Sequence, residues 1–339
     1  MSIISSSQEQ NDTRSRCEDK SEKMRITEID FAKGVLITLM VIGHLTPLKD
    51  LYLTANKWVY AFHMSGFLII SGYLFNTRKS HGDFLRRIRN LAVPYVVFST
   101  VYLVASHFLG ALLSANHDYT FGIKSFIKAI FVSPAGIYWY LHTLIISSVV
   151  WYATDKMRLN DWFTLVIGGG IMYLLSLMVD GYGWENILFF LIGAAMRRSG
   201  KRLTDVIYPT VWSVVPVILI TLACDEFLRD KLSGVGLTLF MLSFLMGMGR
   251  RVPVIIKKIF CTLGENSLSV VLFSPMFTVL TKFYIGFFHF DSSRILWGIA
   301  STVFVVGMCL ICAWGLDRIG LSRILIQKRM FNTSLWKKI

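Results

Sequence analysis

The sequence predicts an all-α protein that crosses a membrane repeatedly, and three observations predict this fold class. The 339 residues are 54% hydrophobic and 17% charged, with a mean hydropathy of +0.56, which soluble domains do not reach. Long apolar runs follow one another along the chain. Lys and Arg gather in alternate connections between those runs. We therefore expect a polytopic transmembrane helical bundle of about ten spans, with both termini in the cytoplasm.

The expected spans are apolar runs of near-membrane length, of which the sixth is the shortest. They cover residues 29–47, 58–76, 91–112, 135–153, 162–179, 184–197, 208–224, 232–249, 265–285 and 295–316. An even number of spans puts both ends of the chain on one side, and the basic loops put that side in the cytoplasm. We expect the net charge of +14 to reflect this topology and contact with membrane lipid, with no nucleic-acid partner.

Both ends of the chain are expected to lie outside a single membrane domain at residues 29–316. Residues 1–28 are polar, charged and serine-rich, which is typical of a disordered cytoplasmic tail, and Met24 is an alternative start. We expect no cleavable signal peptide there, because these residues contain no apolar core. Residues 317–339 are expected to form a basic cytoplasmic tail.

The first span carries three ionisable residues, Asp30, Lys33 and His44. Charge and imidazole inside a bilayer are costly, so such residues mark a functional site by default. On a continuous helix, Lys33 and His44 would lie on one face roughly 16 Å apart along the axis. A neutral imidazole is also the commonest general base. The alternative is that Asp30 and Lys33 pair at i,i+3 while His44 only occupies the headgroup zone.

The second span places His63 at a depth similar to that of His44. Small residues follow it, among them Ser71 and Gly72, and small residues permit close approach of neighbouring helices. Packing alone would explain these small residues. The sequence therefore leaves open whether Ser71 lines a functional channel.

A strongly basic loop precedes the third span and contains Arg86, Arg87 and Arg89. Arginine binds phosphate through two parallel hydrogen bonds, so these residues are candidates for a phosphate clamp. The same residues would also serve as a plain topology signal. Charge alone does not separate these two interpretations.

The outer side is expected to carry further polar candidates. Residues 125–131 are amphipathic and are expected to lie in the outer interface. His142 opens the fourth span, and Glu185 is an outer carboxylate that could meet a hydroxylated ligand, although a solvated loop charge explains it as well. No metal site is expected, because the histidines lack the close helical spacing of metal ligands.

Several motifs, in matching order over residues 25–316, resemble the acyltransferase 3 family of integral membrane O-acyltransferases. The first two spans carry the opening signature and a second pattern in which Ser65 stands where the family usually has proline. The motifs are Arg25…Asp30-x-x-Lys33-Gly34…Gly43-His44, Phe62-His63-Met64-Ser65-Gly66-Phe67…Ser71-Gly72-Tyr73-Leu74-Phe75, Phe84-x-Arg86-Arg87-x-Arg89…Pro94-Tyr95, Trp139-Tyr140-Leu141, Phe189-Phe190-Leu191-x-Gly193 and Gly264-x-x-Ser267-Leu268.

The resemblance implies a reaction between the two sides of the membrane. Acyl-CoA, most simply acetyl-CoA, would be a co-substrate from the cytoplasm, with no permanently bound cofactor. Its phosphates would meet Arg86, Arg87 and Arg89, and Ser71 would line the path of its pantetheine arm. His44 would act as general base on a hydroxyl of a glycan or lipid-linked glycan, or would carry the acyl group transiently.

The same resemblance assigns supporting roles and a location. Lys33 would stabilise negative charge on the donor, with Asp30 holding Lys33. His63, His142 and Glu185 would face the acceptor. The expected location is a bacterial inner membrane, and a separate acyl-accepting partner protein is an open alternative to direct transfer.

Two other classes of protein are compatible with the composition. One is a carrier or flippase for a lipid-linked glycan or a small metabolite, although the sequence shows no pair of matching halves with broken helices. The other is a structural or regulatory membrane subunit, which would leave Lys33 and His44 without a role. Product formation that depends on acyl-CoA separates both from an enzyme.

Overall fold

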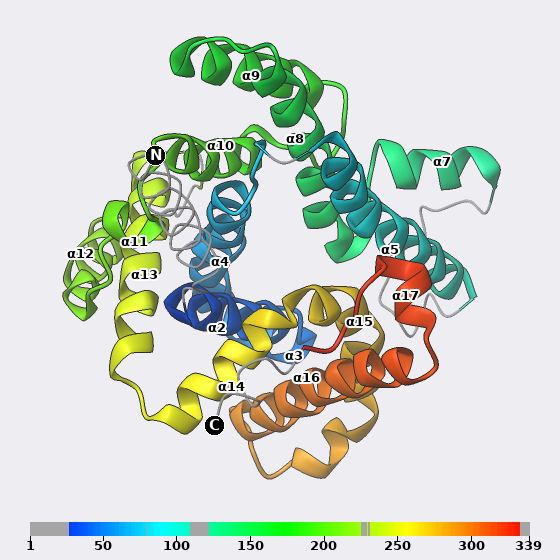
Figure 1. Cartoon of the computed structure of the whole chain (residues 1–339). Coiled ribbons are helices and arrows are strands. Elements are labelled where there is room, and N and C mark those ends of the chain that lie inside the picture. Colours follow the sequence, from blue (N-terminus) through cyan, green and yellow to red (C-terminus); the bar gives the residue numbers. More distant parts are fainter. Residues whose placement is uncertain (1–26, 79, 109–121, 225–228, 230, 333–339) are drawn as a thin grey trace, which may run out of the picture.

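The computed structural model describes residues 27–78, 80–108, 122–224, 229 and 231–332, and every regular element in these ranges is helical (Figure 1). The all-α class is therefore confirmed over this part of the chain. The α-helices are α2 (Thr27–Gly43), α3 (Thr46–Leu51), α4 (Leu53–Tyr73), α5 (His81–Phe108), α7 (Ile123–Phe131), α8 (Trp139–Lys156), α9 (Asp161–Ser176), α10 (Trp184–Arg198), α11 (Leu203–Val206), α12 (Val214–Ala223), α13 (Leu232–Arg251), α14 (Val254–Glu265), α15 (Ser267–Leu280), α16 (Ile295–Arg318) and α17 (Leu321–Ile326). Short 3₁₀ turns are η1 (Gly136–Tyr138), η2 (Val211–Ser213) and η3 (Thr281–Phe288).

Four helical segments in the described residues are long and apolar enough to cross a membrane: α5, α13, the continuous segment 267–288 and α16. A fifth span results if α7 and residues 136–156, which are bent by 44° relative to each other, count as one. Other expected spans are shorter helices, such as α9 and the segment 211–223. The chain is thus built for a membrane, whereas ten spans and the orientation of the termini stay predictions.

The first expected span is divided in the structure, since α2 ends at Gly43 and α3 starts at Thr46. Leu45 between them is extended, with φ −77° and ψ 97°. Pro47 lies in the first turn of α3, where its missing N–H costs nothing. As a result His44 lies in a turn just beyond α2 rather than on the continuous helix that the sequence predicts.

Helices α2 and α4 lie at the centre of the bundle, with α10, α13, α14 and α15 around them (Figure 1). Glycines bring two helix pairs into backbone contact. A side chain on Gly34 of α2 would overlap the carbonyl of Phe260 in α14, and one on Gly193 of α10 would overlap the carbonyl of Ile69 in α4. Small residues at such crossings are the usual basis of helix packing in membranes.

The start of α16 is capped by the preceding loop. The carboxylate of Asp291 accepts hydrogen bonds from the hydroxyl of Ser293 at 2.5 Å and from the backbone N–H of Leu296 at 2.8 Å. The Ser293 hydroxyl is the main reason that the pKa of Asp291 lies below its usual range, and the backbone N–H groups lower it further. This loop therefore contributes a pH-sensitive cap.

The end of the described chain folds back onto the bundle. The carboxylate of Asp317 accepts the backbone N–H groups of Met330 and Phe331 at 2.8 Å each. The side chain of Asn266 exchanges two hydrogen bonds with the backbone of Asn332, at 2.8 and 2.9 Å. Part of the expected tail at 317–339 is thus docked beside α15, while residues 333–339, and residues 1–26 of the other expected tail, lie outside the described residues.

Candidate functional site

The imidazole of His44 is held by the last turn of α2. Its Nδ1 lies 2.7 Å from the carbonyl oxygen of Met40. Because a carbonyl oxygen only accepts, Nδ1 carries the hydrogen and Nε2 keeps a lone pair. A neutral imidazole whose Nε2 is an acceptor is in the protonation state that a general base requires.

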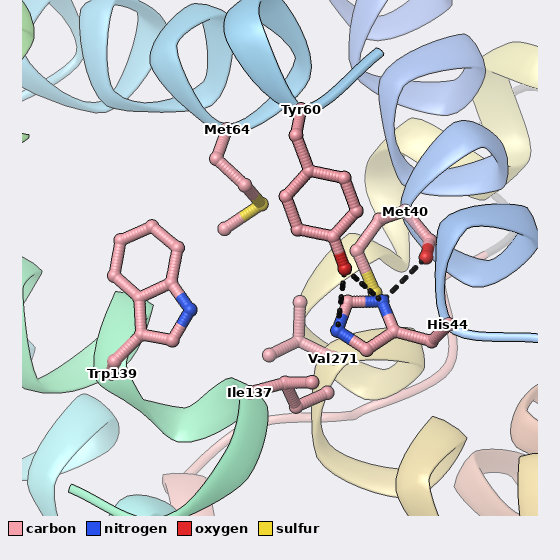
Figure 2. A pocket seen from close by; sticks show the side chains of 7 residues that line it. All are labelled: Met40, His44, Tyr60, Met64, Ile137, Trp139 and Val271. Carbon is pink, nitrogen blue, oxygen red and sulfur yellow. Dashed lines mark hydrogen bonds between the residues drawn. The ribbon is translucent and has the colours of Figure 1, made fainter. Parts of the chain in front are cut away.

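This imidazole faces a small pocket (Figure 2). Tyr60 of α4 places its hydroxyl 3.3 Å from Nε2 and 3.5 Å from Nδ1 of His44. Trp139 at the start of α8 stands across the pocket from the imidazole (Figure 2). The remaining wall is apolar, so water is partly excluded around the imidazole. Its residues are Met40, Met64, Ile137 and Val271.

His63 lies beside this pocket without lining it. Its side chain is 0% exposed, and its Nδ1 lies 2.8 Å from the carbonyl oxygen of Val59. Its Nε2 is buried and has no hydrogen-bond partner among the described residues. The Tyr60 ring separates the two imidazoles, with ring centres 4.8 Å from His63 and 5.8 Å from His44. The structure therefore brings both predicted histidines to one tyrosine.

Asp30 and Lys33 lie near the opposite end of α2 from His44. Lys33 Nζ is 3.7 Å from a carboxylate oxygen of Asp30, which is the i,i+3 pair that the sequence offered as the simpler interpretation. Both side chains are largely buried, with exposed fractions of 18% and 11%. The structure does not bring them into contact with His44, so any role they have in the reaction acts at the far end of the helix.

Of the three predicted arginines, Arg87 turns towards the bundle. Its Nη1 donates to the carbonyl of Leu74 at 3.0 Å, and its guanidinium lies 4.6 Å from the ring centre of Phe75. Arg86 is 66% exposed and 3.6 Å from Asp83, and Arg89 is also exposed. The structure thus separates one inward arginine from two on the surface.

Ser71 has a partner that the sequence did not predict. Its hydroxyl forms a 2.8 Å hydrogen bond with the hydroxyl of Tyr140 in α8. Tyr140 directly follows the pocket residue Trp139 and feels the charge of Arg87. Ser71 and Tyr140 therefore form a hydrogen-bonded pair between the Arg87 end of α4 and the His44 pocket.

The two outer candidates, His142 and Glu185, do not line the pocket. His142 Nε2 lies 3.1 Å from the carbonyl oxygen of Phe131, and its ring packs against Tyr95 of α5. It therefore faces α5 and α7 rather than His44. Glu185, in the first turn of α10, acts electrostatically on Arg229. Within the described residues no group of three or more His, Cys, Asp or Glu side chains is placed to hold a metal ion.

Sequence reasoning gave no role in the site to Tyr60 or Arg229, and it used Trp139 and Tyr140 only as parts of the Trp139-Tyr140-Leu141 motif. Tyr60 had a usable signal, because positions 60, 63 and 64 share one helical face. Arg229 had none, since it stands in a loop rich in charge.

An all-helical bundle with apolar helices of membrane length defines an integral membrane protein, and the imidazole of His44 lines a pocket inside it. The chain belongs to the acyltransferase 3 family, since the family model described as "Acyltransferase domain" matches residues 26–314. The family that the sequence motifs predict is thereby confirmed.

Two curated relatives are both named "Nodulation protein NolL". The protein from Sinorhizobium fredii is 31% identical over 150 residues, which is 40% of this chain and 37% of the relative. The protein from Mesorhizobium japonicum is 31% identical over 158 residues, or 41% of this chain and 38% of the relative. The chain thus matches well under half the length of these relatives. No solved structure matches this chain.

Proposed function

We propose that this protein is a membrane O-acyltransferase that moves an acyl group, in the simplest case acetyl, from cytoplasmic acyl-CoA to a hydroxyl of a cell-surface or exported glycan. The observation that carries the proposal is the state of His44, whose Nδ1–H is engaged by Met40 while Nε2 faces the pocket. Membership of an acyltransferase family supplies the type of reaction. The location we propose is a bacterial inner membrane.

The proposed reaction needs one base and one leaving thiol. Nε2 of His44 takes the proton of the acceptor hydroxyl while its oxygen bonds to the carbonyl carbon of the thioester. The carbon–sulfur bond then breaks, and the departing sulfur takes the proton from the imidazolium, so the base is regenerated. The hydroxyl of Tyr60 lies 3.3 Å from Nε2, so the acceptor hydroxyl would take over this place, and Tyr60 beside it would orient the acceptor. The apolar pocket wall would limit hydrolysis of the thioester by water.

The proposed donor path runs from the Arg87 end of α4 to the pocket. Arg87 would bind a phosphate of the donor, because its guanidinium turns inward and is fixed by the Leu74 carbonyl. The Ser71–Tyr140 pair and then Trp139 would border the path towards His44. Arg86 and Arg89 would attract the donor to the surface without fixing it.

Transfer in sealed vesicles of known orientation tests the proposal. Inside-out vesicles that contain the protein receive radiolabelled acetyl-CoA from outside and a lipid-linked glycan fraction in the lumen, and vesicles without the protein are the control. We expect label in the luminal glycan only when the protein is present. Label in the glycan only from right-side-out vesicles would contradict the orientation, and release of unlabelled, intact glycan to the other side would indicate a flippase.

A further inference from the structure

Arg229 reaches into the bundle from the connection between α12 and α13. Its Nε donates to the hydroxyl of Ser65 in α4 at 3.0 Å. Its guanidinium carbon lies 5.9 Å from the ring centre of Trp139 and 5.8 Å from that of Phe189 in α10. One loop arginine is thus fixed between three helices by a hydroxyl and two aromatic rings.

This guanidinium has unused hydrogen-bonding capacity. Its Nη2 is buried and has no hydrogen-bond partner among the described residues. Burial lowers the pKa of Arg229, and the charge of Glu185 acts in the opposite direction. A buried cationic N–H without an acceptor is unfavourable, so an oxygen from a ligand, most strongly an anionic one, would satisfy it.

His63 offers the complementary group beside this arginine. Its Nδ1–H is engaged by the Val59 carbonyl, so its buried Nε2 is a free acceptor among the described residues. Arg229 is near enough for its charge to act on the His63 imidazole. A donor and an acceptor placed together match a ligand that carries an anionic oxygen next to a hydroxyl group.

The pair adjoins the pocket that holds His44. Trp139, which lies against the guanidinium of Arg229, is also a wall of that pocket (Figure 2). Tyr60 similarly contacts His63 on one side and His44 on the other. A ligand held at Arg229 and His63 would therefore lie next to the proposed base.

We propose that Arg229 and His63 form an acceptor subsite in which Arg229 binds an anionic oxygen group of the glycan and His63 accepts a hydrogen bond from a neighbouring hydroxyl. The shared chemistry fits the carboxylate of an acidic sugar and the diphosphate that joins a glycan to its lipid carrier. The subsite rests on the proposed transferase function, because it selects among acceptors of that reaction. Arg229 acts here as a specificity residue that contacts the acceptor. Glu185 weakens the binding of an anionic acceptor because its carboxylate offsets part of the positive charge of Arg229.

Three acceptors of equal glycan length test the subsite with labelled acetyl-CoA: a free glucuronic-acid oligosaccharide, a free glucose oligosaccharide, and the glucose oligosaccharide on a lipid diphosphate. In Arg229→Gln we expect kcat/KM to fall about 10- to 100-fold for an anionic acceptor. The kcat/KM for the free glucose oligosaccharide and the KM for acetyl-CoA should stay unchanged. A selective loss with the first acceptor identifies the carboxylate, and one with the third identifies the diphosphate.

Two further variants keep the test decisive. Glu185→Gln should raise kcat/KM for the anionic acceptor, which is opposite to the effect of Arg229→Gln, and Arg229→Lys should restore part of the selectivity. An equal fall for all three acceptors, or a rise in the KM for acetyl-CoA alone, would overturn the acceptor subsite. If the unaltered protein acylates none of the glycans, the proposed function fails instead, so the two failures are distinguishable.

Discussion

Replacing Tyr60 by phenylalanine removes the hydroxyl that lies 3.3 Å from Nε2 of His44 and changes little else. The contact is longer than the usual 2.7–2.8 Å of an O–H donor, so it is a weak hydrogen bond. A bond of this kind contributes about 0.5–1.5 kcal/mol, and 1.36 kcal/mol corresponds to a tenfold change in rate. If the Tyr60 hydroxyl orients the acceptor hydroxyl beside the imidazole during proton transfer, kcat should fall about 2- to 12-fold, with the KM for acyl-CoA unchanged.

The assay is the initial rate of label transfer from acetyl-CoA at saturating acceptor, normalised to the amount of folded protein in the membrane. Tyr52→Phe is the matched control, because its hydroxyl donates to the Ser293 carbonyl at the exposed end of α4, outside the pocket. An unchanged kcat in Tyr60→Phe would show that proton transfer does not depend on this hydroxyl. A loss as large as that of a His44 variant would make Tyr60 itself the proton-transfer group and refute the reasoning.

Three further predictions follow from packing, donor binding and capping. Gly34→Ala should lower the melting temperature in detergent by an amount equivalent to about 1–3 kcal/mol, because the new methyl group meets the backbone of α14. The control is Gly170→Ala, whose methyl group meets nothing within 4 Å and should leave the melting temperature unchanged or raise it. Equal effects of the two variants would contradict the close packing. Arg87→Gln should raise the KM for acyl-CoA about tenfold or more, whereas substitution of the exposed arginine, Arg89→Gln, should raise it by less than about fivefold. If a donor titration shows the larger rise in KM for Arg89→Gln, Arg87 is rejected as a ligand of the donor. Asp291→Asn should lower the melting temperature at neutral pH. Because the pKa of Asp291 is lowered in the folded state, its stabilising contribution is complete above about pH 4 and is lost as the pH falls through that lowered pKa. The melting temperatures of variant and parent should therefore converge in acid, and a constant difference would exclude the ionised cap.

Much of the general design is contained in the sequence. Apolar runs predict helices, and ordered motifs predict the family, because both depend on residue type along the chain. The positions of His44 and His63 within their spans predict a similar depth for the two imidazoles, and the structure brings both to Tyr60. The i,i+3 spacing of Asp30 and Lys33 likewise predicts the ion pair of 3.7 Å that the structure contains.

One feature that was not predicted is local: the break after Gly43, which moves His44 off the helix, follows from the geometry of Leu45 and Pro47. The other features depend on contacts between distant segments or on burial. The pairing of Ser71 with Tyr140 joins residues 69 positions apart. Arg229 reaches Ser65 across 164 positions, and no local pattern predicts such a contact. The orientation of the three basic-loop arginines was also undetermined, because their charges are the same and only their burial differs.

The central claim is that Nε2 of His44 takes the acceptor proton, and comparison of His44→Ala with His107→Ala tests it most directly. His107 is exposed near the end of α5, away from the pocket, so it controls for the loss of a histidine as such. Membranes with equal amounts of each folded protein receive labelled acetyl-CoA and the glycan acceptor. We predict that transfer falls by about 10²- to 10⁴-fold in His44→Ala and stays at the parent level in His107→Ala. Parent-level transfer by His44→Ala would contradict the account.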